Sequence, residues 1–263
     1  MTIDTCNNRK EGQACITKNS MSNLTADSEN ENYPIDNVLD EHPKRKWKAA
    51  SVGESTVQFS TASGNNCLAI FNTNATKAVI TLTDPNGVEW EAGVEWSNVD
   101  FAGEHELTTL QQGDSFSLWV DFNNTNSTIS VSIKLTTTVA EPVEVGIIRC
   151  GISNNIGVNP LRGVREGLID YSIVKPLSNG AEFLKKRDIV RTFSGRLYLD
   201  RDRDFYNYMY AIAREVGQEP IAWKITDLNL SDWTVFGKLN AMPNGSHDDP
   251  SKTNISFNIR EVL

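Results

Sequence analysis

The sequence lacks the features of a membrane anchor or of an exported chain. None of its apolar runs approaches the roughly 18 residues that a transmembrane helix needs. The opening residues, MTIDTCNNRKEGQACITKN, contain no apolar core of the kind found in secretory signals. We therefore expect the chain to be made in a cytoplasm, and either to stay there or to leave as part of an assembly.

Motifs for catalysis and cofactor binding are also missing. The sequence contains no G-x-S-x-G, P-loop, dinucleotide-binding glycine pattern or H-E-x-x-H. The alternating charges of residues 201–204 fit the start of a helix, where carboxylates are favoured. His247, Asp248 and Asp249 lie in MPNGSHDDPSKTN, which predicts a solvated loop. A glycan-cleaving enzyme would need two carboxylates paired in a groove, and the sequence does not pair any. We predict that the protein is not an enzyme.

Cysteine and histidine are scarce, with four and three residues in the chain. Cys6, Cys15, Cys67 and Cys150 form no C-x-x-C pair, and the histidines do not cluster with them, so no zinc site is predicted. We expect buried or unreactive thiols. A small loop closed by Cys6 and Cys15 in oxidising surroundings is the alternative. No cofactor is predicted.

The chain has fewer basic than acidic residues, and the two are unevenly distributed along it. The net charge is -9; residues 1–154 hold 10 Lys and Arg against 20 Asp and Glu, whereas residues 155–263 hold 15 against 14. Neither part has the basic surplus that is typical of nucleic-acid binding, so no nucleic-acid partner is expected. The change in charge balance indicates a domain boundary near residue 154.

The first half of the chain reads as a series of short strands. Between residues 56 and 149, stretches rich in Val, Ile, Phe and Thr alternate with turn signals such as Pro85-Asn86-Gly87. This pattern predicts a β-sandwich over residues 21–154. The polar residues 1–20 are expected to form a flexible N-terminal arm that becomes ordered on a partner.

The second half, residues 155–263, predicts a smaller β domain with one helix. Two long strands are joined by a turn at residues 178–180, and about three strands follow the helix. The helix is predicted over about residues 202–216, ending before Gly217. Its apolar stripe consists of Phe205, Met209, Ile212, Ala213 and Val216. The expected fold is therefore mainly β, with an N-terminal jelly-roll β-sandwich followed by this smaller domain.

The segment NYPIDNVLDEHPKRKW, residues 32–47, has neither helical nor strand periodicity. Its two prolines favour extended or turn geometry. Trp47 is expected to close one end of the sandwich, with an indole N–H that needs one hydrogen-bond partner.

These residues resemble a known family. A strand, a Y-P-x-x-N-x-L-D turn and a charged loop ending in tryptophan resemble the opening of galactose-binding-like, or discoidin-like, jelly-roll domains. More narrowly, SENENYPIDNVLDEHPKRKWKAAS is similar to the start of bacteriophage tail and virion structural proteins built on this module. VEVGIIRCG and the stretch up to residue 225 resemble the second half of those proteins, in which an E-x-G-x-I-x-x-G strand leads into a β domain with one helix.

The resemblance implies two kinds of site. Discoidin-like domains often hold a structural calcium before the tryptophan, and Asp40 stands at the aspartate position. Three cations, Lys44 to Lys46, follow it and would repel the ion, so no metal is predicted. Sugar-binding members of the family use aromatic side chains. Trp90 and Trp96 are the candidates here, and their spacing is equally consistent with packing on one buried strand face.

The resemblance and the missing motifs predict a structural component of a bacteriophage tail. It would be a tail-tip, baseplate or minor tail protein, assembled in the host cytoplasm and located in the virion. Its partners would be other tail proteins and copies of itself, without membrane insertion. Tyr206, Tyr208 and Tyr210 are candidate subunit contacts, with ordinary packing at the helix boundary as the alternative.

The alternative function is a carbohydrate-binding module. In that case the acidic sandwich would recognise a glycan on the host surface, using Trp90, Trp96 and His105. Both functions are compatible, because a tail protein can also read a receptor.

Overall fold

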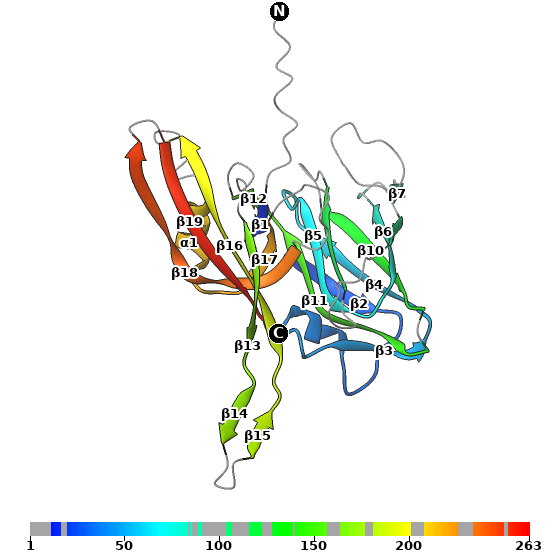
Figure 1. Ribbon diagram of the computed structural model, residues 1–263. Helices are drawn as coiled ribbons and strands as arrows, with labels where there is room; N and C mark the ends of the chain where they lie inside the picture. Colours follow the sequence, from blue (N-terminus) through cyan, green and yellow to red (C-terminus); the bar gives the residue numbers. More distant parts are fainter. Residues whose placement is uncertain are drawn as a thin grey trace, which may run out of the picture.

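The computed structural model describes residues 12–16, 20–83, 85, 89–90, 104–106, 116–122, 128–138, 140–156, 164–176, 181–200, 208–225, 234–249 and 252–263. These residues form three main antiparallel sheets, a two-stranded hairpin, a short 3-10 helix and one α-helix (Figure 1). Within them, no helix is long and apolar enough to cross a membrane.

Two antiparallel sheets from the first half of the chain pack face to face as a β-sandwich. The first sheet runs in the order β2 (Met21–Ala26), β4 (Glu54–Thr61), β10 (Ile129–Thr136), β6 (Lys77–Thr83) and β7 (Glu89–Trp90), and β8 (Glu104–Glu106) also pairs with β6. The second sheet runs in the order β3 (Trp47–Val52), β11 (Pro142–Gly151), β5 (Cys67–Thr73) and β9 (Phe116–Asp121).

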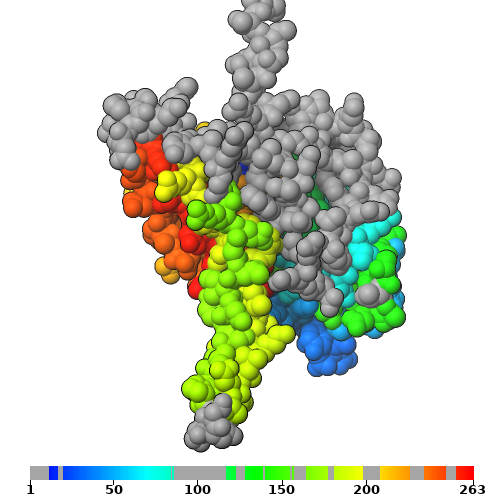
Figure 2. Space-filling model, viewed as in Figure 1, coloured from blue at the N-terminus to red at the C-terminus, as the bar shows by residue number. Residues whose placement is uncertain are grey.

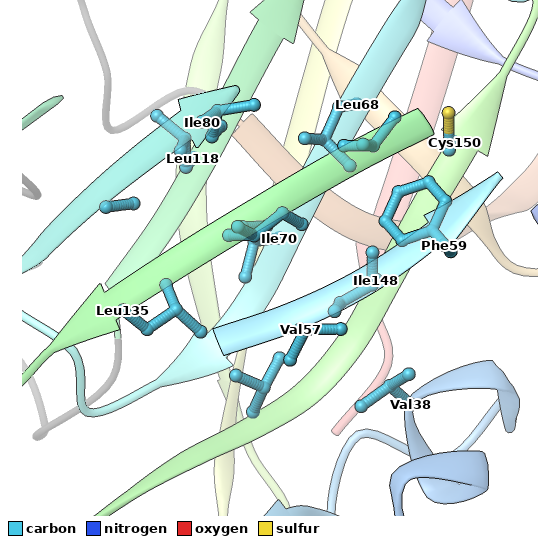
Figure 3. Close-up of a cluster of buried hydrophobic side chains, with 14 of the residues drawn as sticks. Val38, Val57, Phe59, Leu68, Ile70, Ile80, Leu118, Leu135, Ile148 and Cys150 are labelled. Atoms are coloured by element: carbon cyan, nitrogen blue, oxygen red, sulfur yellow. The ribbon is translucent and has the colours of Figure 1, made fainter. Parts of the chain in front are cut away.

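The core of the sandwich follows from strand alternation. Along β10 every second side chain, from Ile129 to Leu135, is buried, and the residues between them face outward. These side chains meet those of the second sheet, including Ile70 and Ile148, in one apolar cluster (Figure 3). The predicted mainly β fold with a sandwich is therefore confirmed.

The C-terminal sheet has seven strands. Their order is β12 (Ser153–Asn155), β1 (Gln13–Cys15), β17 (Ile221–Lys224), β18 (Thr234–Asp249), β19 (Lys252–Glu261), β16 (Ile189–Asp200) and β13 (Arg165–Asp170). The helix α1 (Met209–Val216) buries its apolar stripe, which includes Met209 and Ile212, in the core of this sheet. Gly217 follows the helix with a φ of 59°, a conformation that favours glycine.

Several predicted boundaries differ from the observed ones. The predicted arm, residues 1–20, contains β1, which pairs with β12 and β17 inside the C-terminal sheet. β12 lies across the predicted boundary at 154. The predicted loop at residues 242–254 is wrong at both ends, because β18 continues to Asp249, through register shifts that accommodate Pro243, and β19 begins at Lys252. The helix ends at Val216 as predicted, whereas its predicted start lies outside the described residues.

The sandwich and the C-terminal sheet share a buried cluster, which we call the joint. It explains why β5 and β11 read as nearly continuous apolar runs, since both faces of these strands are covered. The ring centroids of Phe71 and Phe236 lie 5.8 Å apart across the joint. Lys224 Nζ and Asp121 Oδ2, 3.1 Å apart, form an ion pair between β17 and β9. The joint consists of Cys15, Cys67, Ala69, Phe71, Ile147, Ala222 and Phe236.

Arg149, on β11, carries a charge beside the joint and is only 4% exposed. Its guanidinium donates to the carbonyl oxygens of Val38 at 3.2 Å, Asp40 at 2.8 Å and Ile148 at 3.0 Å. Its Cζ lies 5.1 Å from the centroid of the Phe236 ring. Burial lowers the pKa of Arg149 from its ordinary value. The side chain of Arg149 thus holds both the segment of residues 32–47, which we call the opening segment, and the C-terminal sheet against the sandwich.

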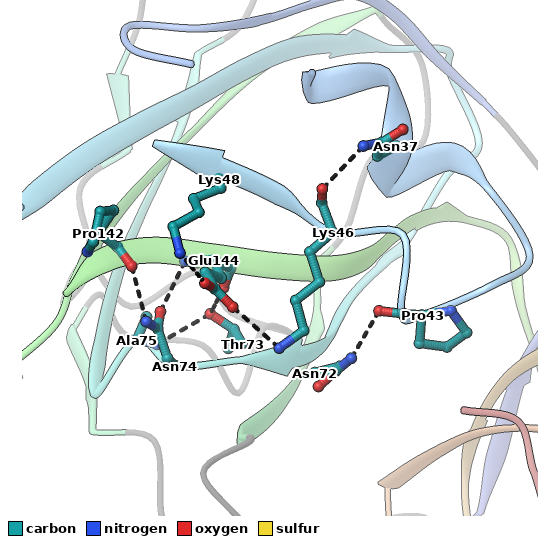
Figure 4. A network of polar contacts seen from close by, with 10 residues as sticks. All are labelled: Asn37, Pro43, Lys46, Lys48, Asn72, Thr73, Asn74, Ala75, Pro142 and Glu144. Carbon is teal, nitrogen blue, oxygen red and sulfur yellow. Dashed lines mark hydrogen bonds and ion pairs between the residues drawn. The ribbon is translucent and has the colours of Figure 1, made fainter. Parts of the chain in front are cut away.

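The opening segment folds around the 3-10 helix η1 (Ile35–Leu39). Asn37 Nδ2 donates to the Lys46 carbonyl at 3.0 Å, which closes the loop between them (Figure 4). Trp47 is fully buried as predicted, but its indole N–H has no hydrogen-bond partner among the described residues, contrary to expectation. The Pro43 carbonyl packs over Gly146, where a Cβ would lie 2.4 Å from that oxygen. Only glycine fits at this position.

Glu144 is the second anchor of the opening segment. Its carboxylate accepts from Lys48 Nζ at 2.6 Å and from Lys46 Nζ at 3.2 Å (Figure 4). Burial raises the pKa of Glu144, but the hydrogen bonds and charges of Lys48 and Lys46 outweigh burial and leave this pKa below its ordinary value.

Replacing Arg149 with Met is expected to lower the free energy of unfolding by about 2–4 kcal/mol, because buried carbonyls lose their donor. Urea denaturation measures this change. The matched control is Lys134→Met, which removes a half-exposed ion pair with Glu54 and is expected to cost less than about 1 kcal/mol. Equal losses in the two variants would contradict the role given to Arg149.

Glu144 is expected to make stability fall in acid. Its folded pKa is depressed, so its contribution is present above the unfolded value, near 4.5, and is lost as pH falls through the folded pKa. Urea denaturation across pH should show that Glu144→Gln flattens this acid loss relative to wild type. If the two proteins lose stability in parallel as the solution is acidified, Glu144 is not the group responsible.

Candidate interaction site

A two-stranded hairpin projects from the base of the C-terminal sheet as a narrow arm (Figures 1 and 2). Among the described residues, its strands β14 (Ile173–Pro176) and β15 (Glu182–Lys185) pair only with each other. Every residue from 181 to 189 is exposed. Isolated two-stranded hairpins are marginally stable in water, so this arm lacks the cover that strands of a sheet normally have.

The hairpin is also where exposed apolar side chains concentrate. Of the ten large apolar side chains that are exposed among the described residues, six lie between residues 168 and 189. Leu184 is 61% exposed, Val174 54% and Phe183 53%. Scattered apolar residues are normal on a protein surface, whereas a cluster on one projecting element indicates a contact site.

The strand register gives the hairpin two different faces. Val174 pairs with Leu184, and side chains alternate along each strand, so these two residues share an apolar face. Lys175 pairs with Phe183 on the opposite face, where Lys185 also lies. That face combines an aromatic ring with two cations. A partner would therefore meet an apolar surface on one side and a cationic surface on the other.

The base of the hairpin is held to the rest of the molecule by polar contacts. Lys44, from the opening segment, forms an ion pair with Asp188, and its hydrogen bond lowers the pKa of Asp188. The Arg187 N–H donates to Ser172 Oγ at 3.0 Å. Arg260 Nη1 donates to the Tyr171 hydroxyl at 3.1 Å. Beside these contacts lies an open depression of about 600 Å³, whose lining includes Lys44, Asp188 and Leu263.

The tyrosines predicted as subunit contacts lie elsewhere. Tyr208 is half-buried and packs on the core of the C-terminal sheet, and Tyr210 is also half-buried. Tyr206 lies outside the described residues. The two strands joined by a turn at 178–180 were predicted, but their role as an exposed contact surface was not, although apolar residues on both faces of the strands could have indicated it.

A second candidate surface lies on the outer face of the six-stranded sheet. An open depression of about 460 Å³ follows β2, β4, β10 and β6 there. Phe59 and Val131 contribute to its floor but are themselves buried. The other residues that line it carry hydroxyl or amide groups: Asn23, Thr25, Gln58, Ser60, Thr81, Thr83, Ser130 and Ser132.

The residues predicted to contact glycan are placed only in part. The backbone of Trp90 pairs with Leu82 at the sheet edge, and that of His105 pairs with Ala78. The side chains of both residues, and all of Trp96, lie outside the described residues. The structure therefore does not bring these predicted residues together into a described site.

Asp40, the position considered for calcium, is engaged by protein groups. Its carboxylate accepts from Arg45 Nη1 at 2.9 Å and from the His42 N–H at 3.1 Å. Burial raises the pKa of Asp40, but these hydrogen bonds outweigh it and lower this pKa overall. Among the described residues, no three Asp, Glu, His or Cys side chains are grouped closely enough to hold a metal ion.

No protein-family model matches the sequence, and no curated protein is significantly similar to it. Two solved structures are similar at 12% identity. One is reduced XRCC1 bound to the DNA polymerase β catalytic domain, with 53% of this chain and 98% of that chain covered and a TM-score of 0.38. The other is chitosan-binding module 1 of a chitosanase/glucanase from Paenibacillus sp. IK-5, with 52% and 98% covered and a TM-score of 0.35. Both similarities are too distant to bear on function.

Proposed function

We propose that this protein is a structural component of a bacteriophage tail, at the tail tip or baseplate or as a minor tail protein, and that it acts through contacts with copies of itself and with other tail proteins. The observation that carries this proposal is the uncovered hairpin. Its exposed Val174, Phe183 and Leu184 are the groups that a partner would bury. The phage setting itself rests on the resemblance of the opening segment and of residues 143–225.

Apolar burial supplies the driving force in this proposal. Fully burying a Leu, Val or Phe side chain contributes roughly 1.5–3 kcal/mol. A partner that covers one face of the hairpin would bury Val174 and Leu184, and one that also wraps the opposite face would bury Phe183. The hairpin register places Val174 and Leu184 side by side, which makes one continuous apolar surface. A neighbouring strand could also pair with a free edge of β14 or β15, because neither strand has a second partner.

Charge supplies specificity. Lys175, Lys185, Lys186 and Arg187 are exposed on the hairpin and its base. The sandwich offers the opposite sign, since Glu29 and Glu31, just before the opening segment, and Asp36 within it are exposed. A hairpin that docks on the acidic sandwich of the next copy makes a head-to-tail contact, and such contacts close into rings or extend as filaments.

Replacing Leu184 with Asp is expected to abolish self-association of the full chain, because a carboxylate would have to be buried with the apolar face of the hairpin. Light scattering coupled to size-exclusion chromatography measures the mass across a concentration series. The matched control is Val52→Asp, since Val52 is 57% exposed on the sandwich, away from the hairpin. Val52→Asp should associate like wild type.

A wild-type chain that stays monomeric at every concentration would contradict contacts between copies. Detection of the protein in purified particles tests the tail setting separately. Its absence from virions would end that part of the proposal, whatever the hairpin does.

Glycan recognition is the second candidate function. The observation in its favour is the depression on the outer sheet face, where hydroxyl and amide groups from four strands converge. Such groups match the donors and acceptors of a sugar. Gln58 and Thr81 flank Ser132 in one cross-strand row, so these side chains are placed to bind together.

If the sheet face binds a glycan, the full chain should bind specific sugars on a glycan array. Replacing Gln58 with Leu should weaken that binding about tenfold or more, because a buried sugar hydroxyl would lose its hydrogen-bond partner. Lys134→Met, on the same sheet but outside the depression, is the control. An array without any bound glycan would dismiss this function.

A further inference from the structure

Three cysteines among the described residues are buried and are not in a disulfide. Cys15 and Cys150 are 1% exposed and Cys67 is 0% exposed. The fold brings them to the junction of the two domains from three separate strands, β1, β5 and β11. Cys15 and Cys67 belong to the joint, whereas Cys150 belongs to the core of the sandwich.

Strand register separates Cys67 from Cys150. Cys67 pairs with Gly151 and Cys150 pairs with Leu68, so the two cysteines are offset by one residue on neighbouring strands. Side chains alternate between the faces of a sheet, so these two thiols point in opposite directions. Cys150 Sγ lies 3.4 Å from Thr61 Oγ1, inside the sandwich. Cys67 Sγ donates to the Gly151 carbonyl at 3.3 Å.

Cys15 reaches Cys67 from the other side of the joint. It pairs with Ser153 and Ala222 in the C-terminal sheet. Both side chains lie in the joint, and a hydrogen bond between the two thiols is among the causes that raise the pKa of Cys67, so the two sulfur atoms lie close together. The sequence separation hides this proximity, because β1 precedes the sandwich in the chain and yet belongs to the C-terminal sheet.

We propose that Cys15 and Cys67 form a disulfide in oxidising surroundings, and that this bond fastens β1, and with it the C-terminal sheet, to the sandwich. The inference is independent of the tail setting and of the hairpin. It is an alternative to the predicted loop between Cys6 and Cys15, of which Cys6 lies outside the described residues.

The bond forms by thiol–disulfide exchange with a small organic disulfide such as glutathione disulfide. One cysteine thiolate attacks a sulfur of glutathione disulfide, which gives a mixed disulfide and releases one glutathione thiolate. The other cysteine thiolate then attacks the protein sulfur of the mixed disulfide and releases the second glutathione. The cysteines lose two electrons and two protons, and the glutathione disulfide gains both as two thiols.

The buried setting controls when this happens. Burial, together with the hydrogen bond between Cys67 and Cys15, raises the pKa of Cys67 well above its ordinary value, so little thiolate exists while the joint is closed. Reaction therefore requires β1 to open transiently. The pair stays reduced in a reducing cytoplasm and oxidises slowly elsewhere.

The test incubates the purified full chain with glutathione disulfide, alkylates the remaining thiols after unfolding, and maps the linked peptides by mass spectrometry. The expected product is a Cys15–Cys67 link, with Cys150 fully alkylated. Thermal unfolding of the oxidised protein should occur at a higher temperature than that of the reduced protein, because the link constrains the unfolded chain. Cys150→Ser is the matched control and should behave like wild type, whereas Cys67→Ser should lose both the link and the shift.

Refolding from denaturant in a mixture of reduced and oxidised glutathione gives every thiol access to the oxidant. A Cys67–Cys150 or Cys6–Cys15 product, or no link under these conditions, would overturn the pairing. A Cys15–Cys67 link that leaves the unfolding temperature unchanged would overturn the proposed fastening of β1.

Discussion

The arrangement of the whole molecule depends on one buried guanidinium. Arg149 takes a positive charge into a nearly inaccessible place, where a charge is costly unless it is well solvated by protein groups. Carbonyl oxygens from the opening segment and the face of Phe236 provide that solvation. The opening segment, β11 and the C-terminal sheet must therefore all be in place together, because each supplies part of the environment that makes this charge tolerable.

The same constraint explains why the sandwich does not stand alone. β5 and β11 are covered by the first sheet on one face and by the C-terminal sheet on the other. A sandwich cut out at residues 21–154 would expose Phe71 and Ile147, and the cut at 154 would divide β12, which pairs with β1. The sandwich and the C-terminal sheet are parts of one packed structure, and the hairpin is the element that this structure leaves uncovered.

Much of the fold could be predicted from residue patterns. Alternation in β10 and the apolar stripe of α1 depend on neighbours within one element, and these predictions agree with the structure. β1 could not be predicted in the same way. It has three residues, and its partners come from distant strands, so only tertiary packing selects it. β18 was missed beyond residue 240 because proline and glycine signalled a loop, whereas a bulge keeps them in the strand.

The candidate site was less predictable for a related reason. Tyrosines on a helix satisfy a general preference for contacts, but burial of Tyr208 depends on how α1 packs on its sheet. The exposure of Leu184 depends on where the C-terminal sheet ends and the hairpin begins, and the residues around Leu184 do not by themselves determine that point. Arg149, similarly, reads as an exposed strand residue until the C-terminal sheet covers it.

The central claim is that the hairpin is the surface that a neighbour covers, while the joint holds the rest of the molecule together. Hydrogen exchange of the backbone amides tests this claim most directly, in dilute monomer and at a concentration where the chain associates. The account predicts fast exchange for the amides of β14 and β15 in the monomer, strong protection of the same amides on association, and slow exchange of β5 and β11 in both states. Hairpin amides that are already protected in the monomer, or that stay unprotected in the associated protein, would contradict it.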